Sequence, residues 1–201
     1  MSDQIYCYHN SDVLINKLNI RDSEILLEAE RKLTMLRISD LIDSPIKGEF
    51  DLKHLQIIHK YIFQDIYAWA GEIRIVDIAK QNMFCKVQYI YEQASSIFES
   101  LKKGNFLTGL GRDEMVSKIS YYYSEINALH PFREGNGRSQ REFIRELALY
   151  CNYRIDFRKV DKNLMLEASK DSFLCNYSKM EEIFDICLSE KLWVLVKYIS
   201  K

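Results

Sequence analysis

The residues best suited to chemistry lie in one short stretch, residues 130–141, with the sequence HPFREGNGRSQR. His130 titrates near neutral pH and can accept a proton from an attacking group. Glu134 offers a hard oxygen ligand of the kind that Mg²⁺ prefers when it bridges phosphates. Convergent polar groups of this kind predict a reactive site, because no packing requirement of a core asks for such a set.

Two glycines and two arginines complete the stretch. Gly135 and Gly137 lack a Cβ, so the backbone can turn its N–H groups toward a common point. A helix is predicted to begin here, and the N–H groups and positive dipole end of a helix N-terminus favour phosphate. Arg138 lies in the first turn and Arg141 one turn later on roughly the same face. We therefore expect both guanidinium groups to reach the oxygens of a bound polyphosphate.

Two amphipathic helices must position this stretch. Upstream, apolar residues at three- and four-residue spacing follow Asp113 and Glu114, and they predict a helix that ends near Leu129. Downstream, Phe143, Ile144, Leu147 and Ala148 predict a second helix. The reactive stretch therefore lies in the turn between two helices.

Further helices are predicted along the chain. Asp22, Asp51 and Asp161 are the expected N-caps of three of them. His54 and His59 lie on the second of these helices at the wrong interval for two ligands on one face, so they are interpreted as surface or packing histidines. Helical spacing also covers residues 90–101, 180–188 and 191–199.

Residues 71–86 break the helical pattern. The segment is rich in β-branched residues, and Gln81-Asn82 has the composition of a turn before Phe84 resumes the apolar side. A short β-hairpin is predicted there. Its β-branched residues are Ile73, Ile75, Val76 and Ile78.

Composition limits the classes of protein. A chain of 201 residues is long enough for one domain with a substantial core, and residues 1–20 are expected to form an irregular arm over it. Lys plus Arg number 28 against 29 Asp plus Glu, so nothing in the charge favours nucleic acid or an acidic membrane as a partner. Five cysteines without a C-x-x-C pair fit a reducing, cytoplasmic compartment, in the cell of origin or in one to which the protein is delivered. No signal peptide or membrane span is recognisable.

The pattern His-x-Phe-x-Glu-Gly-Asn-Gly-Arg-x-x-Arg resembles, at every fixed position, the signature of the Fic family, named for cell filamentation. The resemblance extends from about Asp12 onward. It implies a mainly α fold, a helical bundle with a short β-hairpin flap over the active site, formed by one domain over residues 1–201. It also implies transfer of AMP from Mg·ATP to a Ser, Thr or Tyr hydroxyl of a target protein.

The resemblance assigns roles residue by residue. His130 matches the catalytic base, Glu134 the metal ligand and Phe132 an apolar anchor of the loop. The residues that match the phosphate-binding set are Gly135, Asn136, Gly137, Arg138 and Arg141. The residues that resemble the target-docking flap are Ile78, Ala79, Lys80 and Phe84, although Cys85-Lys86 stands where many relatives have Ala-Pro.

Alternatives remain within and beyond this family. Relatives that transfer the γ-phosphate carry Lys at the position of Gly137, so the Gly favours AMP transfer, whereas UMP or phosphocholine donors stay open. A nucleotide-binding regulatory module without transfer activity is the alternative from another class. The inhibitory pattern [Ser/Thr]-x-x-x-Glu-[Gly/Asn] is matched only in part, at Ser95–Glu99 and Ser178–Glu182. We therefore expect a toxin-like protein that a small helical antitoxin-like partner inhibits in trans.

Overall fold

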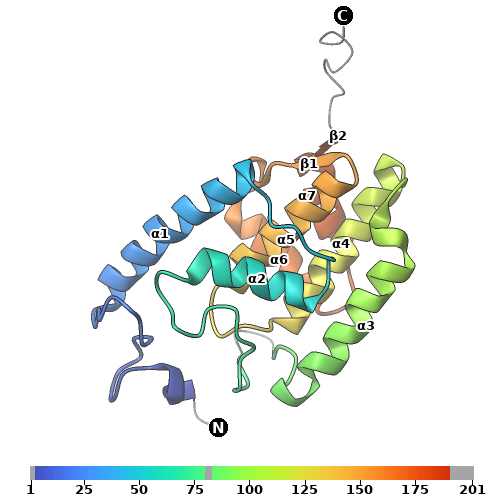
Figure 1. The fold of residues 1–201 in the computed structure, drawn as a ribbon. Coiled ribbons are helices and arrows are strands. Elements are labelled where there is room, and N and C mark those ends of the chain that lie inside the picture. Colours follow the sequence, from blue (N-terminus) through green and yellow to red (C-terminus); the bar gives the residue numbers. More distant parts are fainter. Residues whose placement is uncertain (1–2, 80–82, 191–201) are drawn as a thin grey trace, which may run out of the picture.

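The computed structural model describes residues 3–79 and 83–190, which form a bundle of helices (Figure 1). This arrangement confirms the predicted mainly α fold. The helices are α1 (Ser23–Asp43), α2 (Leu52–Phe63), α3 (Ile90–Lys103), α4 (Arg112–Leu129), α5 (Asn136–Tyr150), α6 (Lys162–Ser172) and α7 (Ser178–Cys187). Short 3-10 turns occur at Asp3–Tyr6, Val87–Tyr89, Asn105–Leu107 and Phe157–Lys159. The helix predicted over 191–199 lies outside the described residues.

The predicted N-caps form. The carboxylate of Asp22 accepts hydrogen bonds from the backbone N–H groups of Glu24 and Ile25, both at 2.9 Å. Asp51 and Asp161 cap α2 and α6 in the same way. Because the first N–H groups of a helix have no intrahelical acceptor, each of these carboxylates satisfies donors that would otherwise need water.

Helix α5 lies in the middle of the bundle, where it packs against α2 on one side and α4 on the other (Figure 1). Its apolar face is fully buried. The helix that carries the second half of the reactive stretch, residues 136–141, is therefore anchored in the core. Four side chains form this face. Burial of each of the three larger ones stabilises the fold by about 1.5 to 3 kcal/mol. These side chains are Phe143, Ile144, Leu147 and Ala148.

The regular sheet does not lie where the sequence predicted a hairpin. Strands β1 (Tyr153–Ile155) and β2 (Leu188–Glu190) pair antiparallel, with Arg154 opposite Ser189. No local pattern in the sequence predicts this pairing, because its two strands are more than thirty residues apart. The two strands close the end of the bundle beside α5 and α7.

Within the described residues of the flap, 71–79 and 83–86, an antiparallel bridge joins Ala79 to Met83, and Phe84 N donates to Ile78 O at 3.4 Å. Below this bridge the two legs are joined by the buried guanidinium of Arg74, which donates to the carbonyl groups of Val76 (2.7 Å) and Cys85. These carbonyls, one on each leg, are satisfied by a side chain instead of by the opposite leg.

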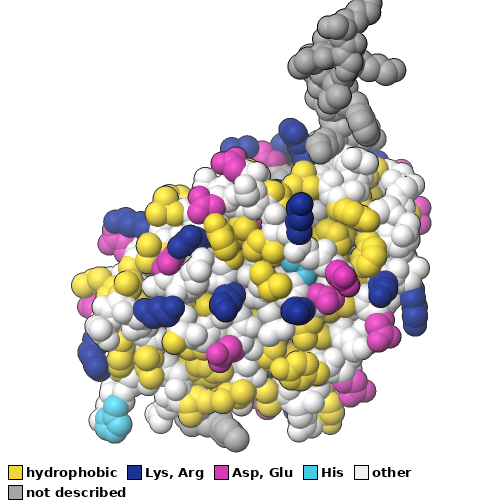
Figure 2. Space-filling view, in the orientation of Figure 1, with side chains coloured by type: hydrophobic (Ala, Val, Ile, Leu, Met, Phe, Trp, Pro, Cys, Tyr) yellow, Lys and Arg dark blue, Asp and Glu magenta, His cyan; other side chains and the backbone are white. Residues whose placement is uncertain are grey.

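Charged side chains of both signs are interspersed on the face shown in Figure 2, as the near-zero net charge of −1 predicts. Apolar side chains also remain exposed there, including several on α1. No helix within residues 3–79 and 83–190 is both long enough and apolar enough to cross a membrane.

Candidate functional site

His130 terminates α4 in a left-handed conformation (φ 44°, ψ 61°), and its N–H still donates to Ile126 O at 3.1 Å. This conformation is costly for a residue with a Cβ and is common at strained functional positions. The ring Nδ1 lies 3.2 Å from the carbonyl oxygen of Asn127, and the ring stacks on Phe84 with centroids 3.6 Å apart. Because a carbonyl can only accept, Nδ1 carries a hydrogen, and this hydrogen bond fixes the orientation of the ring.

The loop after His130 is closed by the side chain of Asn136. Its Oδ1 accepts from Phe132 N at 2.8 Å, and its Nδ2 donates to Phe132 O at 2.7 Å. Phe132 is fully buried. The Asn136 amide is therefore used to fix the shape of the loop.

Gly135 is required by its surroundings. Its φ is +79°, and a Cβ built there would lie 2.1 Å from the ring of Phe63. Its carbonyl accepts from the N–H groups of Arg138 and Ser139 at 3.1 and 3.2 Å, which starts α5. The close approach of loop and α2 is possible only without a side chain at this position.

The motif faces a cavity of about 490 Å³. His130, Glu134 and Arg141 line it from the loop and from α5, together with Asn136 and Gly137. Burial raises the pKa of Tyr123, whose hydroxyl contacts the Arg141 guanidinium. A further wall is formed by α6 and by the residue that follows it. Its residues are Lys162, Met165, Leu166, Ser169 and Lys170 of α6, and Phe173.

A smaller cavity of about 170 Å³ lies between the motif loop and the flap. His130, Glu134 and Phe84 border both cavities, so the histidine stands at their junction. The predicted docking residues Ile78 and Ala79 line the smaller one, whereas Lys80 lies outside the described residues. The remaining residues that line the smaller cavity are Asp77 and Arg133.

Arg138 does not share the cavity with Arg141. Its Nη2 donates to Glu30 Oε1 of α1 at 2.5 Å, and its Nη1 to Thr34 Oγ1 at 3.2 Å. The guanidinium also lies 4.7 Å above the ring of Phe63. The sequence predicted that both arginines point to one place. In the structure, a buried carboxylate on α1 binds Arg138 instead.

The comparisons with known proteins identify the family. The model of the Fic/DOC family matches residues 49–148. The probable protein adenylyltransferase Fic of Escherichia coli is 34% identical over 187 residues, covering 92% of each chain. This chain belongs to the Fic/DOC family.

Two further relatives extend this result. The Fic domain is 39% identical over 190 residues to the protein adenylyltransferase VbhT of Bartonella schoenbuchensis, an alignment that covers 94% of this chain and 40% of VbhT. The chain thus spans less than half the length of that relative. The N-terminal Fic domain of a VirB-translocated Bep effector protein from Bartonella quintana, crystallised with bound ADP, matches at a TM-score of 0.91 and 27% identity, covering 94% of this chain and 96% of that one.

Several residues that shape the Fic site escaped the sequence interpretation. Arg74, 1% exposed, donates through Nε to the carbonyl oxygen of His130 at 2.8 Å and through Nη1 and Nη2 to both legs of the flap. Burial lowers the pKa of this guanidinium, although it stays charged. The wall of α6 was also missed, because Met165 and Phe173 at helical spacing are indistinguishable from core residues in a sequence.

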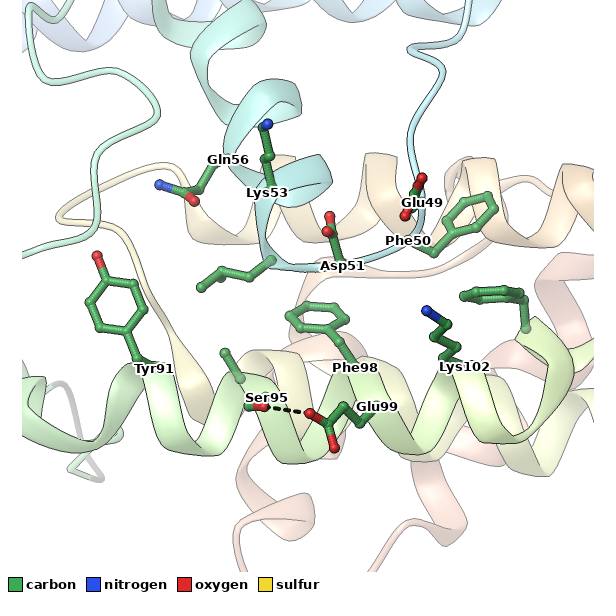
Figure 3. Close-up of a pocket in the computed structure, with 13 residues that line it drawn as sticks. Glu49, Phe50, Asp51, Lys53, Gln56, Tyr91, Ser95, Phe98, Glu99 and Lys102 are labelled. Carbon is green, nitrogen blue, oxygen red and sulfur yellow. Dashed lines mark hydrogen bonds between the residues drawn. The ribbon is translucent and has the colours of Figure 1, made fainter.

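A separate groove of about 450 Å³ lies between α3 and the segment that leads into α2 (Figure 3). Phe50 and Phe98 form part of its wall, and none of its lining residues belongs to the Fic motif. One of the partial matches to the inhibitory pattern lies here: Ser95 Oγ donates to Glu99 Oε1 at 3.0 Å, one helical turn away. Glu99 is thus held on the surface of α3.

Proposed function

We propose that this Fic domain transfers AMP from ATP to a Ser, Thr or Tyr hydroxyl of a target protein. The single observation that carries the proposal is the position of His130, which lines both the larger and the smaller cavity while the Asn127 carbonyl holds its Nδ1. Relatives of this chain are named protein adenylyltransferases, and the Bartonella quintana Fic domain has ADP bound. These two lines support a nucleotide in the larger cavity and a target side chain in the smaller one.

The reaction balances with the groups available. The target hydroxyl oxygen attacks the α-phosphorus, a new O–P bond forms, and the bond from the α-phosphorus to the bridging oxygen breaks, so pyrophosphate leaves. Nε2 of His130 takes the hydroxyl proton. The N-terminal turn of α5 and the guanidinium of Arg141 are placed to stabilise the negative charge of the phosphates. Positioning and charge stabilisation carry most of such a transfer.

The phosphate-binding role predicted for the glycine loop divides into two tasks. Gly135 and Asn136 give the loop its shape, whereas Gly137 and Arg141, together with Asn136, line the cavity itself. The apolar residues of α6 offer a wall for the base and sugar of the nucleotide. For Arg138, the ion pair with Glu30 supports a role in holding the start of α5.

The residues present fit a single Mg²⁺. Mg²⁺ is commonly bound by one or two carboxylates together with substrate phosphates and water, so a site with one carboxylate suffices. The Glu134 side chain is 37% exposed and borders both cavities. Among the described residues no cluster of three His, Cys, Asp or Glu side chains could hold a metal without a substrate. When bound, the ion would offset charge on the phosphates, and Glu134 would be its protein ligand.

The flap is proposed to dock the target by offering backbone groups for an added strand. Ile78 and Ala79 line the smaller cavity beside His130, which supports this role. Replacing Ile78 by Ala should therefore weaken target modification more than ATP turnover to pyrophosphate. Equal losses in both reactions would make the hairpin a connector only.

Labelled nucleotides separate the proposal from its alternatives. A lysate incubated with the protein and ATP labelled at the α-phosphate should yield labelled protein, whereas label at the γ-phosphate should appear only in pyrophosphate. Labelled target from γ-ATP would indicate phosphoryl transfer, and preferred incorporation from UTP or CDP-choline would indicate another donor. Tight ATP binding without any labelled protein at any dose would favour a regulatory module.

We further propose that the domain is a toxin-like protein inhibited in trans by a small helical partner. Among the ion pairs of the described residues, none joins Arg141 to Glu99 or to the exposed Glu182. Expressed alone, the wild-type chain should modify proteins and slow growth. A silent wild type that either Glu99→Gly or Glu182→Gly makes strongly active would show that the inhibitor is internal.

A further inference from the structure

Helix α2 carries two buried histidines, His54 and His59, and each one joins two backbone segments. At His59, Nδ1 accepts from the N–H of Gly71 at 2.8 Å, and Nε2 lies 3.0 Å from the carbonyl oxygen of Glu134. Because an N–H group can only donate, Nδ1 is the acceptor and Nε2 carries the hydrogen. The neutral ring therefore satisfies one donor at the start of the flap and one acceptor in the motif loop.

Packing fixes the orientation of this ring. His59 is fully buried and stacks on Phe132 at 3.9 Å and on Phe63 at 4.7 Å between ring centroids. Burial lowers its pKa to about 3, so the ring stays neutral at physiological pH. An imidazole held on both faces cannot swing away from the carbonyl that it binds.

The bonded carbonyl belongs to the peptide unit that joins Glu134 to Gly135. The N–H of the same unit, on Gly135, donates to Oε1 of the Glu134 side chain at 2.9 Å. In a trans peptide the C=O and the N–H point in opposite directions, so fixing one fixes the other. Gly135 allows either orientation of this plane at low cost, because glycine populates positive and negative φ about equally. Something outside the loop must therefore select the orientation.

We propose that His59 is a positioning residue that locks the 134–135 peptide plane and thereby aims the Glu134 carboxylate at the metal and phosphate position. The inference rests on the proposed function, which makes Glu134 the metal ligand. Without the Nε2–H donor, the carbonyl loses its partner, the plane can turn over, and the Gly135 N–H no longer holds the carboxylate.

The chain supplies a matched control in His54. It is 2% exposed, its Nδ1 accepts from Phe50 N at 3.3 Å, and its Nε2 lies 3.0 Å from Ile46 O. Both histidines thus bond backbone groups from the same helix, but His54 bonds the segment between α1 and α2, away from the motif. Its Nε2 also lies 3.1 Å from Glu146 Oε2 in the second half of α5. Loss of fold stability should be similar for the two sites, whereas loss of metal positioning should be specific to His59.

The experiment compares His59→Asn, His59→Gln and His54→Asn. Asn places an amide near Nδ1 and cannot reach Glu134, whereas Gln can place a donor near Nε2. Calorimetry of ATP binding across a Mg²⁺ series should show that H59N needs about tenfold more Mg²⁺ for half-maximal affinity, the equivalent of one lost hydrogen bond. H59Q and H54N should stay within about threefold of wild type on the same scale.

A second readout uses the nucleotide-free protein. Amide hydrogen exchange at Gly135 should be about tenfold faster in H59N than in wild type, and unchanged in H54N, because only H59N frees the 134–135 plane. If H59N fails to fold, H59Q decides: protection of Gly135 and a wild-type Mg²⁺ curve support the lock, and loss of both overturns it.

Equal behaviour of H59N and H54N in both measurements would reduce His59 to a packing residue. Failure of the proposed function looks different, because the wild-type protein itself would then not bind Mg·ATP or would show no dependence on Mg²⁺.

Discussion

The ion pair between Glu30 and Arg138 offers a quantitative test of how α5 is held. The Glu30 side chain is 7% exposed and the Arg138 side chain 21% exposed. Glu30 also accepts a hydrogen bond from the hydroxyl of Tyr67, and burial together with this carboxylate raises the pKa of that hydroxyl. Glu30→Met therefore removes the carboxylate shared by a largely buried cation and a buried hydroxyl, although Arg138 keeps its hydrogen bond to Thr34.

Removing one partner of a buried ion pair costs about 3 to 5 kcal/mol. Because one fifth of the Arg138 side chain reaches water, we expect a loss at or below the lower end of this range, about 2 to 3 kcal/mol in the free energy of unfolding. For a chain of this size that corresponds to a Tm lower by about 5 to 10 °C. Arg138→Met should cost a similar amount, because it leaves the carboxylate of Glu30 buried without its cation.

Urea denaturation of the two single variants and the double variant completes a cycle. The double variant places two apolar side chains at the site and should lose only about 1 kcal/mol, which gives a coupling of about 3 to 5 kcal/mol. The control is Glu28→Met on the same helix, whose partner Lys32 is equally exposed and whose loss should change stability little. Additive losses would refute the reasoning about stability. Tighter ATP binding by Glu30→Met would refute the structural role of Arg138, since it would mean that Glu30 competes with phosphate.

Further tests address the motif and its support. His130→Ala should abolish transfer and leave Mg·ATP affinity within a few-fold, as calorimetry beside a transfer assay can show, because the base holds no phosphate. Glu134→Ala should raise the Mg²⁺ concentration needed for activity, and an unchanged titration would count against its role. Gly135→Ala should destabilise the fold by about 2 to 5 kcal/mol, because it strains the positive φ and clashes with Phe63. Adding Phe63→Leu to this variant should recover part of the lost stability, as urea denaturation can measure. The pKa of His59 is 6.5 in the unfolded chain and about 3 in the folded protein, so the unfolded chain takes up the proton at higher pH. Relative to His59→Gln, wild type should therefore lose up to about 1.4 kcal/mol of stability per pH unit as the pH falls from 6.5 toward 3. Parallel pH profiles of the two proteins would contradict this.

The sequence was informative where structure is set by neighbours in the chain. N-caps such as Asp22 act within one helical turn, and the positive φ of Gly135 is a local requirement that glycine meets. These features depend on residue type and spacing, which a sequence displays directly.

The remainder depends on partners far away in the chain. Glu30 meets Arg138 across more than one hundred positions, and His59 meets the carbonyl of Glu134 across seventy-five. The sequence predicted His59 to be a surface or packing residue, and its burial fits the second of these, but spacing on one helix says nothing about backbone groups of a distant loop. Arg74 was missed for the same reason, since its Nε donates to the carbonyl oxygen of His130, fifty-six positions along the chain.

Arg74 has a consequence for redesigning the specificity of this domain. Its guanidinium binds the carbonyl of His130 and one carbonyl on each leg of the hairpin, so His130 and the base of the flap form one mechanical unit. Phe84 belongs to the same unit, because its ring stacks on the ring of His130. A foreign loop grafted between Asp77 and Phe84 would keep both of these contacts, so the target could be changed while His130 keeps its orientation.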